Sequence, residues 1–306
     1  MPDTRMFPRD AAVPQVARLT DTPDQLGESP VWDPQAQSLW WIDGVAGKVR
    51  RLRFAGSEPG ELDCFSFDGH VGSIALADEG CLLVALEHEV VLFSPDEPVR
   101  LLLLRLDEAD PRMRLNDGKT DRRGRFLCAG MGRGGEAIGA LHRLCDNRDH
   151  AVLHEGLTVG NGICFSPDGR VLYFADTPAR KVFACDYDPV TGAASKLREH
   201  IDTAALGSGI DGATVDSEGN LWGALIRTAR IGCFDPSGAL VRSIAAPTDL
   251  PSSLAFGGPA MDRLFVTSIR DSGTGRAVSD HPLGGHLFAI DGLGATGIPE
   301  TRFGHF

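Results

Sequence analysis

The sequence has no apolar run long enough to span a membrane and no excess of basic residues. The aliphatic stretch 101–104 is closed by an arginine on each side, whereas a membrane span needs about 18 apolar residues. Lysine and arginine total 30 against 42 acidic residues, a net charge of −12, whereas nucleic acids and anionic membranes select basic surfaces. Charges and prolines occupy the N-terminus where a signal peptide has its apolar core. We therefore expect a cytoplasmic monomer or small homo-oligomer with no nucleic-acid or membrane partner.

Cysteine motifs and the common catalytic motifs are missing too. The seven cysteines form an odd, scattered set without a C-x-x-C pair, which argues against a disulfide framework or a zinc knuckle. We expect them to be reduced and mostly buried. The chain also lacks the H-E-x-x-H spacing of zinc hydrolases and the G-x-S-x-G nucleophile motif.

Turn-forming residues are abundant instead. The 37 glycines and 19 prolines make up about 18% of the 306 residues, above the roughly 12% of average proteins and below the level of disordered chains. They punctuate a repeat in which a short apolar strand, a turn with glycine and a second apolar strand follow one another. Two clear copies are NGICFSPDGRVLYFA (161–175) and DGATVDSEGNLWGA (211–224). The six copies begin at Glu28, Gly72, Asn116, Asn161, Asp211 and Ser252, 41 to 50 residues apart.

Each copy continues into further strand-like stretches. The third stretches are 48–52, 90–93, 140–144, 182–186, 230–234 and 286–290. A period of 40–50 residues with four strands is typical of a β-propeller blade. We therefore predict an all-β fold, a six-bladed β-propeller with four antiparallel strands per blade. Residues 1–306 would form this single domain, with 1–14 as an irregular lead. The aspartate–glycine pairs are interpreted as hairpin turns, because none completes a calcium-loop pattern.

The first residue of each copy falls in one column of the repeat. In a propeller the first strand of each blade lines the central channel, so this column would form a ring near one mouth. Four of its six members are Glu28, Asn116, Asn161 and Asp211, where a core strand would carry apolar residues. Carboxylate and amide oxygens converging on one point suit a hard divalent cation. A single residue of this kind would more simply bond the loop backbone, but four in one column favour a metal.

Arg114 lies two residues before Asn116 and should face the same side of its strand. A buried arginine beside a ring of oxygens would bind an anionic or hydroxyl-rich ligand, although a surface arginine in a basic loop explains the sequence equally well. Gly72 would leave one sector of the ring open. The loops 177–181 and 269–281 follow inner strands on the same face, and we expect them to shape the pocket.

Four segments resemble the regucalcin (senescence marker protein 30)/gluconolactonase family. They are LGESPVW (26–32), RLNDGK (114–119), NGICFSPDG (161–169) and DGATVDSEGNLW (211–222), and GHLFAID (285–291) is similar as well. The resemblance implies a six-bladed propeller that holds one divalent cation and hydrolyses sugar lactones. Carried over by position, the metal ligands are Glu28, Asn161 and Asp211, and the substrate contacts are Arg114 and Asn116. Calcium is the expected ion, with zinc, manganese, magnesium and iron(II) as alternatives.

The sugar preference is left open by one departure from the family pattern. Some relatives contact the sugar through an acidic residue after an A-G-x-M segment, but Gly134 stands at the aligned position and Glu136 is the candidate substitute. We expect Asp211 to act as the catalytic base on water that attacks the lactone carbonyl. Two alternatives share the ring: a paraoxonase-like esterase or phosphotriesterase with a more apolar pocket, and a non-catalytic calcium-binding propeller.

Overall fold

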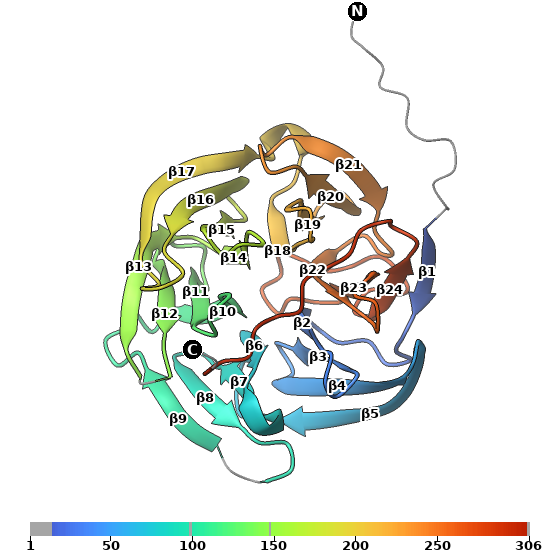
Figure 1. The fold of residues 1–306 in the computed structure, drawn as a ribbon, viewed down its shortest axis with the longest axis horizontal. Coiled ribbons are helices and arrows are strands. Elements are labelled where there is room, and N and C mark those ends of the chain that lie inside the picture. Colours follow the sequence, from blue (N-terminus) through green and yellow to red (C-terminus); the bar gives the residue numbers. More distant parts are fainter. Residues whose placement is uncertain (1–13, 98–99, 147, 305–306) are drawn as a thin grey trace, which may run out of the picture.

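The computed structural model describes residues 14–97, 100–146 and 148–304. Within these residues, 24 strands form six four-stranded antiparallel sheets arranged in a ring (Figure 1). This confirms the predicted six-bladed β-propeller. Two short 3-10 turns, η1 (Asp78–Gly80) and η2 (Ala204–Leu206), are the helical elements of the described chain. Most of the predicted irregular lead, residues 1–13, lies outside the described residues.

The first three blades run consecutively from the inner strand to the outer strand. Blade 1 consists of β2 (Gly27–Asp33), β3 (Ser38–Asp43), β4 (Lys48–Ala55) and β5 (Glu58–Ser66). Blade 2 consists of β6 (Ser73–Leu76), β7 (Leu82–Ala85), β8 (Glu89–Phe93) and β9 (Arg100–Arg105). Blade 3 consists of β10 (Met113–Thr120), β11 (Phe126–Gly132), β12 (Gly139–Leu144) and β13 (His150–Leu157).

The last three blades complete the circle. Blade 4 consists of β14 (Gly160–Phe165), β15 (Val171–Asp176), β16 (Lys181–Tyr187) and β17 (Ala194–Asp202). Blade 5 consists of β18 (Ile210–Val215), β19 (Leu221–Leu225), β20 (Arg230–Phe234) and β21 (Leu240–Ala245). Blade 6 consists of β22 (Pro251–Gly257), β23 (Arg263–Ser268), β24 (Phe288–Asp291) and, as its outer strand, β1 (Gln15–Arg18). The N-terminal strand thus closes the ring by pairing with the last strand.

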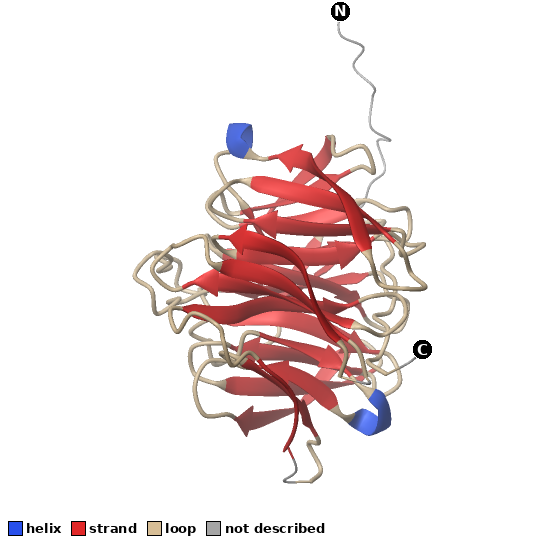
Figure 2. Ribbon diagram, turned by 90° about the vertical axis from the view of Figure 1, so that its left-hand side faces the viewer, coloured by secondary structure: helices blue, strands red, loops and turns tan. Residues whose placement is uncertain are grey.

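The hydrophobic core lies between the blades. Each of six buried clusters combines side chains of two neighbouring blades. Figure 2 shows the ring from the side, with the strands running roughly across its thickness. Because both faces of a middle strand are covered, β3 is buried at every position, whereas the outer strand β5 is mostly exposed. Between blades 1 and 6, Trp32 stacks on Phe265 with ring centroids 5.7 Å apart.

The hairpin turns behave as the sequence predicts. Gly124, Gly169 and Gly219 adopt φ angles of +81°, +70° and +88°, which favour glycine. The preceding aspartates use their carboxylates to accept backbone N–H groups of the turn, as Asp216 does from Glu218 and Asn220. These carboxylates therefore shape the blade edges. The seven cysteines all lie in the described part of the chain, none of them forms a disulfide there, and four of them are buried. Within the described chain, no helix has the length and apolar character needed to cross a membrane.

A C-terminal strap, residues 292–304, crosses the end of the channel opposite the predicted ring (Figure 1). Glu300 lies 3.2 Å from the Lys119 ammonium, and Arg302 lies 2.6 Å from the Asp33 carboxylate. Phe303 is buried in the core between blades 2 and 3, and its N–H donates to the carbonyl of Leu76 at 2.8 Å. The strap therefore ties together inner strands that are far apart in the sequence.

We expect Phe303→Ala to destabilise the protein by roughly 3 kcal/mol, because it removes a buried ring and leaves a cavity at the end of the strap. In a chain of this length the unfolding midpoint should fall by several degrees. Thermal unfolding followed by circular dichroism measures the change, and Val190→Ala, at a side chain 79% exposed, is the matched control. Equal midpoints for the two variants would show that the strap contributes little to stability.

Candidate active site

The four polar members of the predicted ring meet in one cavity. Glu28 lies on β2, Asn116 on β10, Asn161 on β14 and Asp211 on β18, each near the start of the inner strand of its blade. All four line a cavity of about 470 Å³ at one mouth of the channel. Arg114 lines the same cavity and is buried, as are Asn161 and Asp211. The structure therefore brings together five of the six residues selected from the sequence.

A β-bulge marks the ring in five of the six inner strands. Regular pairing is interrupted between Glu28 and Val31, and at the equivalent points of β10, β14, β18 and β22. Ser29 and Gly162, each one residue after a ring member, adopt φ angles of +50° and +58°. Such bulges redirect side chains and are common beside functional sites. Here they lie where the strand presents its polar residue to the channel.

The two other column positions do not reach the cavity. Ser252 is fully buried, and its Oγ donates to the carbonyl of Gly27. Gly72 lies just before β6, where a Cβ atom would come within 2.8 Å of the backbone carbonyl oxygens of Leu115 and Asn116. The expectation that Gly72 leaves a sector of the ring open is therefore wrong. Glycine is required there because the backbones of blades 2 and 3 approach closely.

A chain of hydrogen bonds connects the side chains of the site. The Arg114 guanidinium donates to Oδ1 of Asn116 at 2.7 Å, and Nδ2 of Asn116 donates to Oδ1 of Asn161 at 2.7 Å. Nδ2 of Asn161 donates in turn to Oδ1 of Asp211 at 2.6 Å and to the Thr177 hydroxyl at 2.8 Å. The carboxylate of Asp211 is thus oriented by a network that begins at the arginine.

Burial and charge repulsion make the carboxylates easy to protonate in the metal-free protein. Burial is the main cause that raises the pKa of Asp211 to about 8, and the nearby negative charge of Asp117 adds to it. Burial also raises the pKa of Glu28 well above its usual value, helped by repulsion from Asp211 and Asp117. Burial lowers the pKa of Arg114 to about 10, so this guanidinium stays protonated at neutral pH.

The donor set fits a hard divalent cation. Two mutually repelling carboxylates gain most from a positive ion placed between them, and the adjacent amide of Asn161 offers a neutral oxygen. Among the described residues, no group of three His, Cys, Asp or Glu side chains is arranged to hold a metal. An ion here would therefore depend on an amide ligand, and Asn161 would present Oδ1 to it in place of Nδ2.

Glu136, the remaining predicted substrate contact, is not among the residues that line the cavity. Its carboxylate folds back onto the backbone N–H of Gly134 at 2.9 Å and lies 3.5 Å from the Arg112 guanidinium. Gly134 and Gly135 line the cavity at this point. A local turn and a neighbouring ion pair thus direct the acid away from the pocket, which the sequence pattern does not reveal.

Two further residues of the site, Thr177 in the expected loop 177–181 and Asp117, were given no individual role from the sequence. Thr177 holds Asn161 through its hydroxyl, which also donates to the carbonyl of Ile210 at 2.7 Å. Asp117 accepts the backbone N–H groups of Gly118 and Ile163, and its charge raises the pKa values of both ring carboxylates. The position of Asp117 directly after Asn116 in the sequence could have indicated that it belongs to the site.

The loops 177–181 and 269–281 both contribute to the cavity, as expected.

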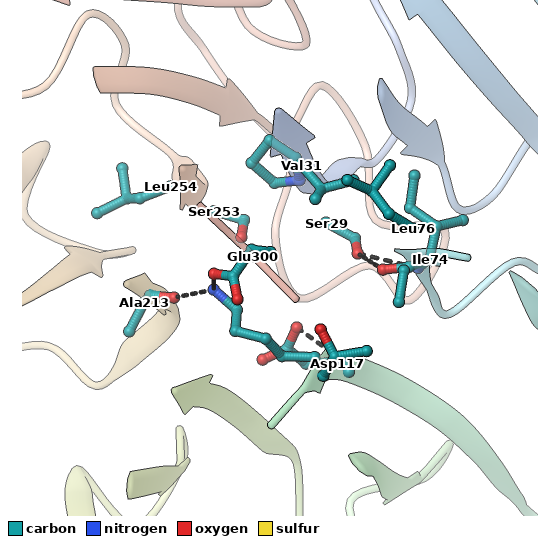
Figure 3. Close-up of a pocket in the computed structure, with 14 residues that line it drawn as sticks. Ser29, Val31, Ile74, Leu76, Asp117, Ala213, Ser253, Leu254 and Glu300 are labelled. Atoms are coloured by element: carbon teal, nitrogen blue, oxygen red, sulfur yellow. Dashed lines mark hydrogen bonds and ion pairs between the residues drawn. The ribbon is translucent and has the colours of Figure 1, made fainter. Parts of the chain in front are cut away.

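A second, smaller cavity of about 20 Å³ lies further along the channel, toward the strap (Figure 3). Asp117, Lys119, Ser29 and Glu300 are among the residues that surround it. The Lys119 ammonium donates to the carbonyl of Ala213 at 3.2 Å and pairs with Glu300. This volume holds about one water molecule. The substrate-sized space therefore lies on the ring side of the channel.

The geometry can now be compared with known proteins. A model of the SMP-30/gluconolactonase/LRE-like region matches residues 26–270. The chain belongs to the SMP-30/gluconolactonase/LRE-like family. It is 32% identical to pentonolactonase XacC of Haloferax volcanii, covering 94% of this chain and 97% of that protein. It is likewise 32% identical to L-arabinolactonase of Azospirillum brasilense, covering 94% and 95%. The crystal structure of regucalcin from Agrobacterium tumefaciens, a calcium-binding protein, has a TM-score of 0.86 and 27% identity, covering 94% and 96%.

Proposed function

We propose that this member of the SMP-30/gluconolactonase/LRE-like family hydrolyses a sugar lactone to the aldonic acid in a reaction that depends on a divalent metal ion. The observation that carries the proposal is the hydrogen-bonded series Arg114–Asn116–Asn161–Asp211, which converges with Glu28 in a cavity of sugar size. Two relatives that match over almost the whole chain are lactonases by name. The side chains of Arg114, Asn116 and Asn161 in the cavity supply hydrogen-bonding partners for the hydroxyl groups of a sugar.

Different residues of the site would bind the metal, accept the proton and orient the substrate. Glu28, Asn161 and Asp211 would hold the ion, which when bound supplies a Lewis acid that polarises the carbonyl and acidifies water. Asp211, oriented by Asn161, takes a proton from the attacking water, whose oxygen bonds to the carbonyl carbon. The ring C–O bond then breaks, and its oxygen takes the proton from Asp211 and becomes a hydroxyl group. Arg114 and Asn116 orient the lactone and stabilise the negative charge that develops on the carbonyl oxygen.

One experiment tests this proposal against its alternatives. Protein stripped with a chelator is supplied with calcium, zinc, manganese, magnesium or iron(II), and acid release is followed with a pH indicator on aldonolactones, aryl esters and phosphotriesters. Metal-dependent acid release confined to lactones supports the proposal. Turnover of aryl esters or phosphotriesters instead would identify the paraoxonase-like activity. Tight metal binding with no acid release from any substrate would identify a non-catalytic protein.

Arg114→Ala should raise KM by roughly ten- to a hundredfold, because a buried charged donor to the substrate is lost. Metal affinity should change much less, since the arginine is not a ligand. Steady-state kinetics and calorimetric titration with the metal separate the two effects. Arg123→Ala is the matched control, because Arg123 is exposed and lies at the turn between β10 and β11, away from the cavity. A variant that loses metal affinity but keeps its KM would remove Arg114 from the substrate site.

A further inference from the structure

The cavity is positively charged in a strongly acidic protein. The chain carries a net charge of −12, yet the cavity lining has two acidic side chains, Glu28 and Asp211, and four arginines. A divalent ion at the ring would neutralise both carboxylates. Arg114 lies beside the ring and is accounted for by the reaction. The charge of the other three arginines, Arg180, Arg227 and Arg276, is not used by the chemistry proposed above.

These three arginines, named here the mouth arginines, occupy equivalent places in three consecutive blades. Arg180 lies between β15 and β16, Arg227 between β19 and β20, and Arg276 between β23 and β24. Equivalent loops of a propeller emerge on the same face, so the three side chains surround one side of the cavity entrance. All three are exposed while lining the cavity. They are therefore accessible to a ligand that enters from solvent.

Two of the mouth arginines, Arg227 and Arg276, contact neighbouring loops. The Arg227 guanidinium donates to the backbone carbonyl of Arg276 at 3.3 Å, which ties the loops of blades 5 and 6 together. The Arg276 guanidinium reaches across to blade 3, where a Cβ atom on Gly135 would come within 3.2 Å of it. Gly135, with a φ of +95°, leaves room for this guanidinium at the cavity wall.

Within the described residues, two other arginines on this face are held in ion pairs, unlike the mouth arginines. Arg112 pairs with Asp110 and Glu136, and Arg133 pairs with Glu87. In the described part of the chain, no carboxylate forms an ion pair with Arg180, Arg227 or Arg276. A neutral sugar needs alternating donors and acceptors, whereas three unpaired guanidinium groups match an anion with several oxygens.

We propose that the substrate is a sugar lactone that carries a second, anionic group at the end remote from the lactone carbonyl, and that the mouth arginines bind this group. The shared chemistry is that of a carboxylate, sulfonate or phosphate. The inference rests on the proposed lactonase function and narrows its substrate class. Placing the lactone carbonyl at the ring leaves the remote end of the sugar at the entrance, where the mouth arginines lie.

The test compares lactones of matched size and different charge. A lactone of glucaric acid with a free carboxylate is measured beside its primary amide, which is isosteric and uncharged, and beside gluconolactone. We expect kcat/KM to be at least roughly tenfold higher for the acid than for the amide at low ionic strength, and the preference to shrink as salt is added. Sulfonated and phosphorylated gluconolactones then identify which anion is preferred.

Substitution of the mouth arginines tests whether they cause the preference for the acid over the amide. Each of Arg180→Ala, Arg227→Ala and Arg276→Ala should lower the acid-to-amide ratio by roughly three- to tenfold, and the triple variant by more. Arg123→Ala is the matched control, because Arg123 is an exposed arginine at the β10–β11 turn on the opposite face, and it should leave both substrates unchanged. Melting temperatures confirm that all variants are folded.

The outcomes separate the two proposals. If gluconolactone is hydrolysed but the acid and the amide are turned over equally, or if the variants keep the wild-type ratio, the inference about charge is wrong while the lactonase proposal stands. If no lactone is hydrolysed with any metal, the proposed function fails and the inference fails with it. A ratio that falls with each arginine removed and with added salt supports the inference.

Discussion

Asp211→Asn should lower kcat by about a thousandfold or more while the propeller stays folded. General-base catalysis by a positioned side chain contributes roughly 10²–10⁴ to rate, and an amide cannot take a proton from water at neutral pH. The substitution keeps the size of the side chain, and its Oδ1 can still accept the hydrogen bond from Asn161. It also replaces a buried ionisable carboxyl group with a neutral amide, so the metal-free variant should be at least as stable as the wild type.

A second aspartate in the same blade provides the control. Asp216 is also buried, but its carboxylate accepts the indole N–H of Trp222 and the side-chain amide of Asn220, at 2.9 Å each. Asp216→Asn should therefore lower the unfolding temperature and leave kcat unchanged below that temperature. Kinetics with a pH indicator, together with circular dichroism, compare the variants. A folded Asp211→Asn protein with full activity would remove Asp211 from the reaction.

Excess metal distinguishes two roles of Asp211. If the carboxylate serves only as a ligand, the variant binds the ion more weakly and saturating metal restores turnover. If it also takes the proton, turnover stays low after calorimetry shows that the site is filled. We expect the second result.

The sequence was sufficient to predict the blades and the ring because both depend on local patterns. A turn glycine between two apolar strands is specified by residues that are neighbours in the chain. Once the copies are aligned, the channel positions follow from propeller geometry. Glu28, Asn116, Asn161 and Asp211 could therefore be placed in one cavity although they lie in four different blades.

Features that depend on distant contacts could not be predicted in this way. The pairing of β1 with β24 joins the two ends of the chain, and Glu300 reaches Lys119 from the C-terminal strap. The close approach that requires glycine at position 72 involves the backbone of a neighbouring blade. Glu136 is an acid at a plausible place in the sequence, yet Arg112 and the Gly134 N–H draw it away from the cavity. Each of these outcomes was decided by partners outside the local pattern.

The metal-free protein should lose stability as the pH rises from 5 to 8. The folded protein raises the pKa of Asp211 from 3.8 to about 8, chiefly through burial, and raises that of Glu28 as well. Between pH 3.8 and about 8, the folded chain keeps a proton on Asp211 that the unfolded chain has released. The contribution of Asp211 is therefore complete at low pH and is lost as the pH approaches 8, a change on the order of 4 kcal/mol.

The comparison with Asp211→Asn isolates this contribution. Exposed aspartates with lowered pKa values, such as Asp202 beside Lys181, act in the opposite direction at acidic pH in both proteins. Because both proteins contain these aspartates, their effect cancels when the unfolding free energy of the wild type is subtracted from that of the variant. Urea unfolding in the presence of a chelator measures both free energies. We expect the variant to become more stable relative to the wild type as the pH rises.

A divalent cation should reverse the trend in the wild type. Binding requires both carboxylates to be deprotonated, so it releases protons and becomes tighter as the pH rises. The stabilisation by metal should then be larger at pH 8 than at pH 5, because it grows with the ratio of free metal to dissociation constant. Calorimetry in two buffers of different ionisation enthalpy detects the released protons. A wild-type protein whose metal-free stability follows that of Asp211→Asn across this range, with no proton release on binding, would contradict a buried carboxylate pair at the ring.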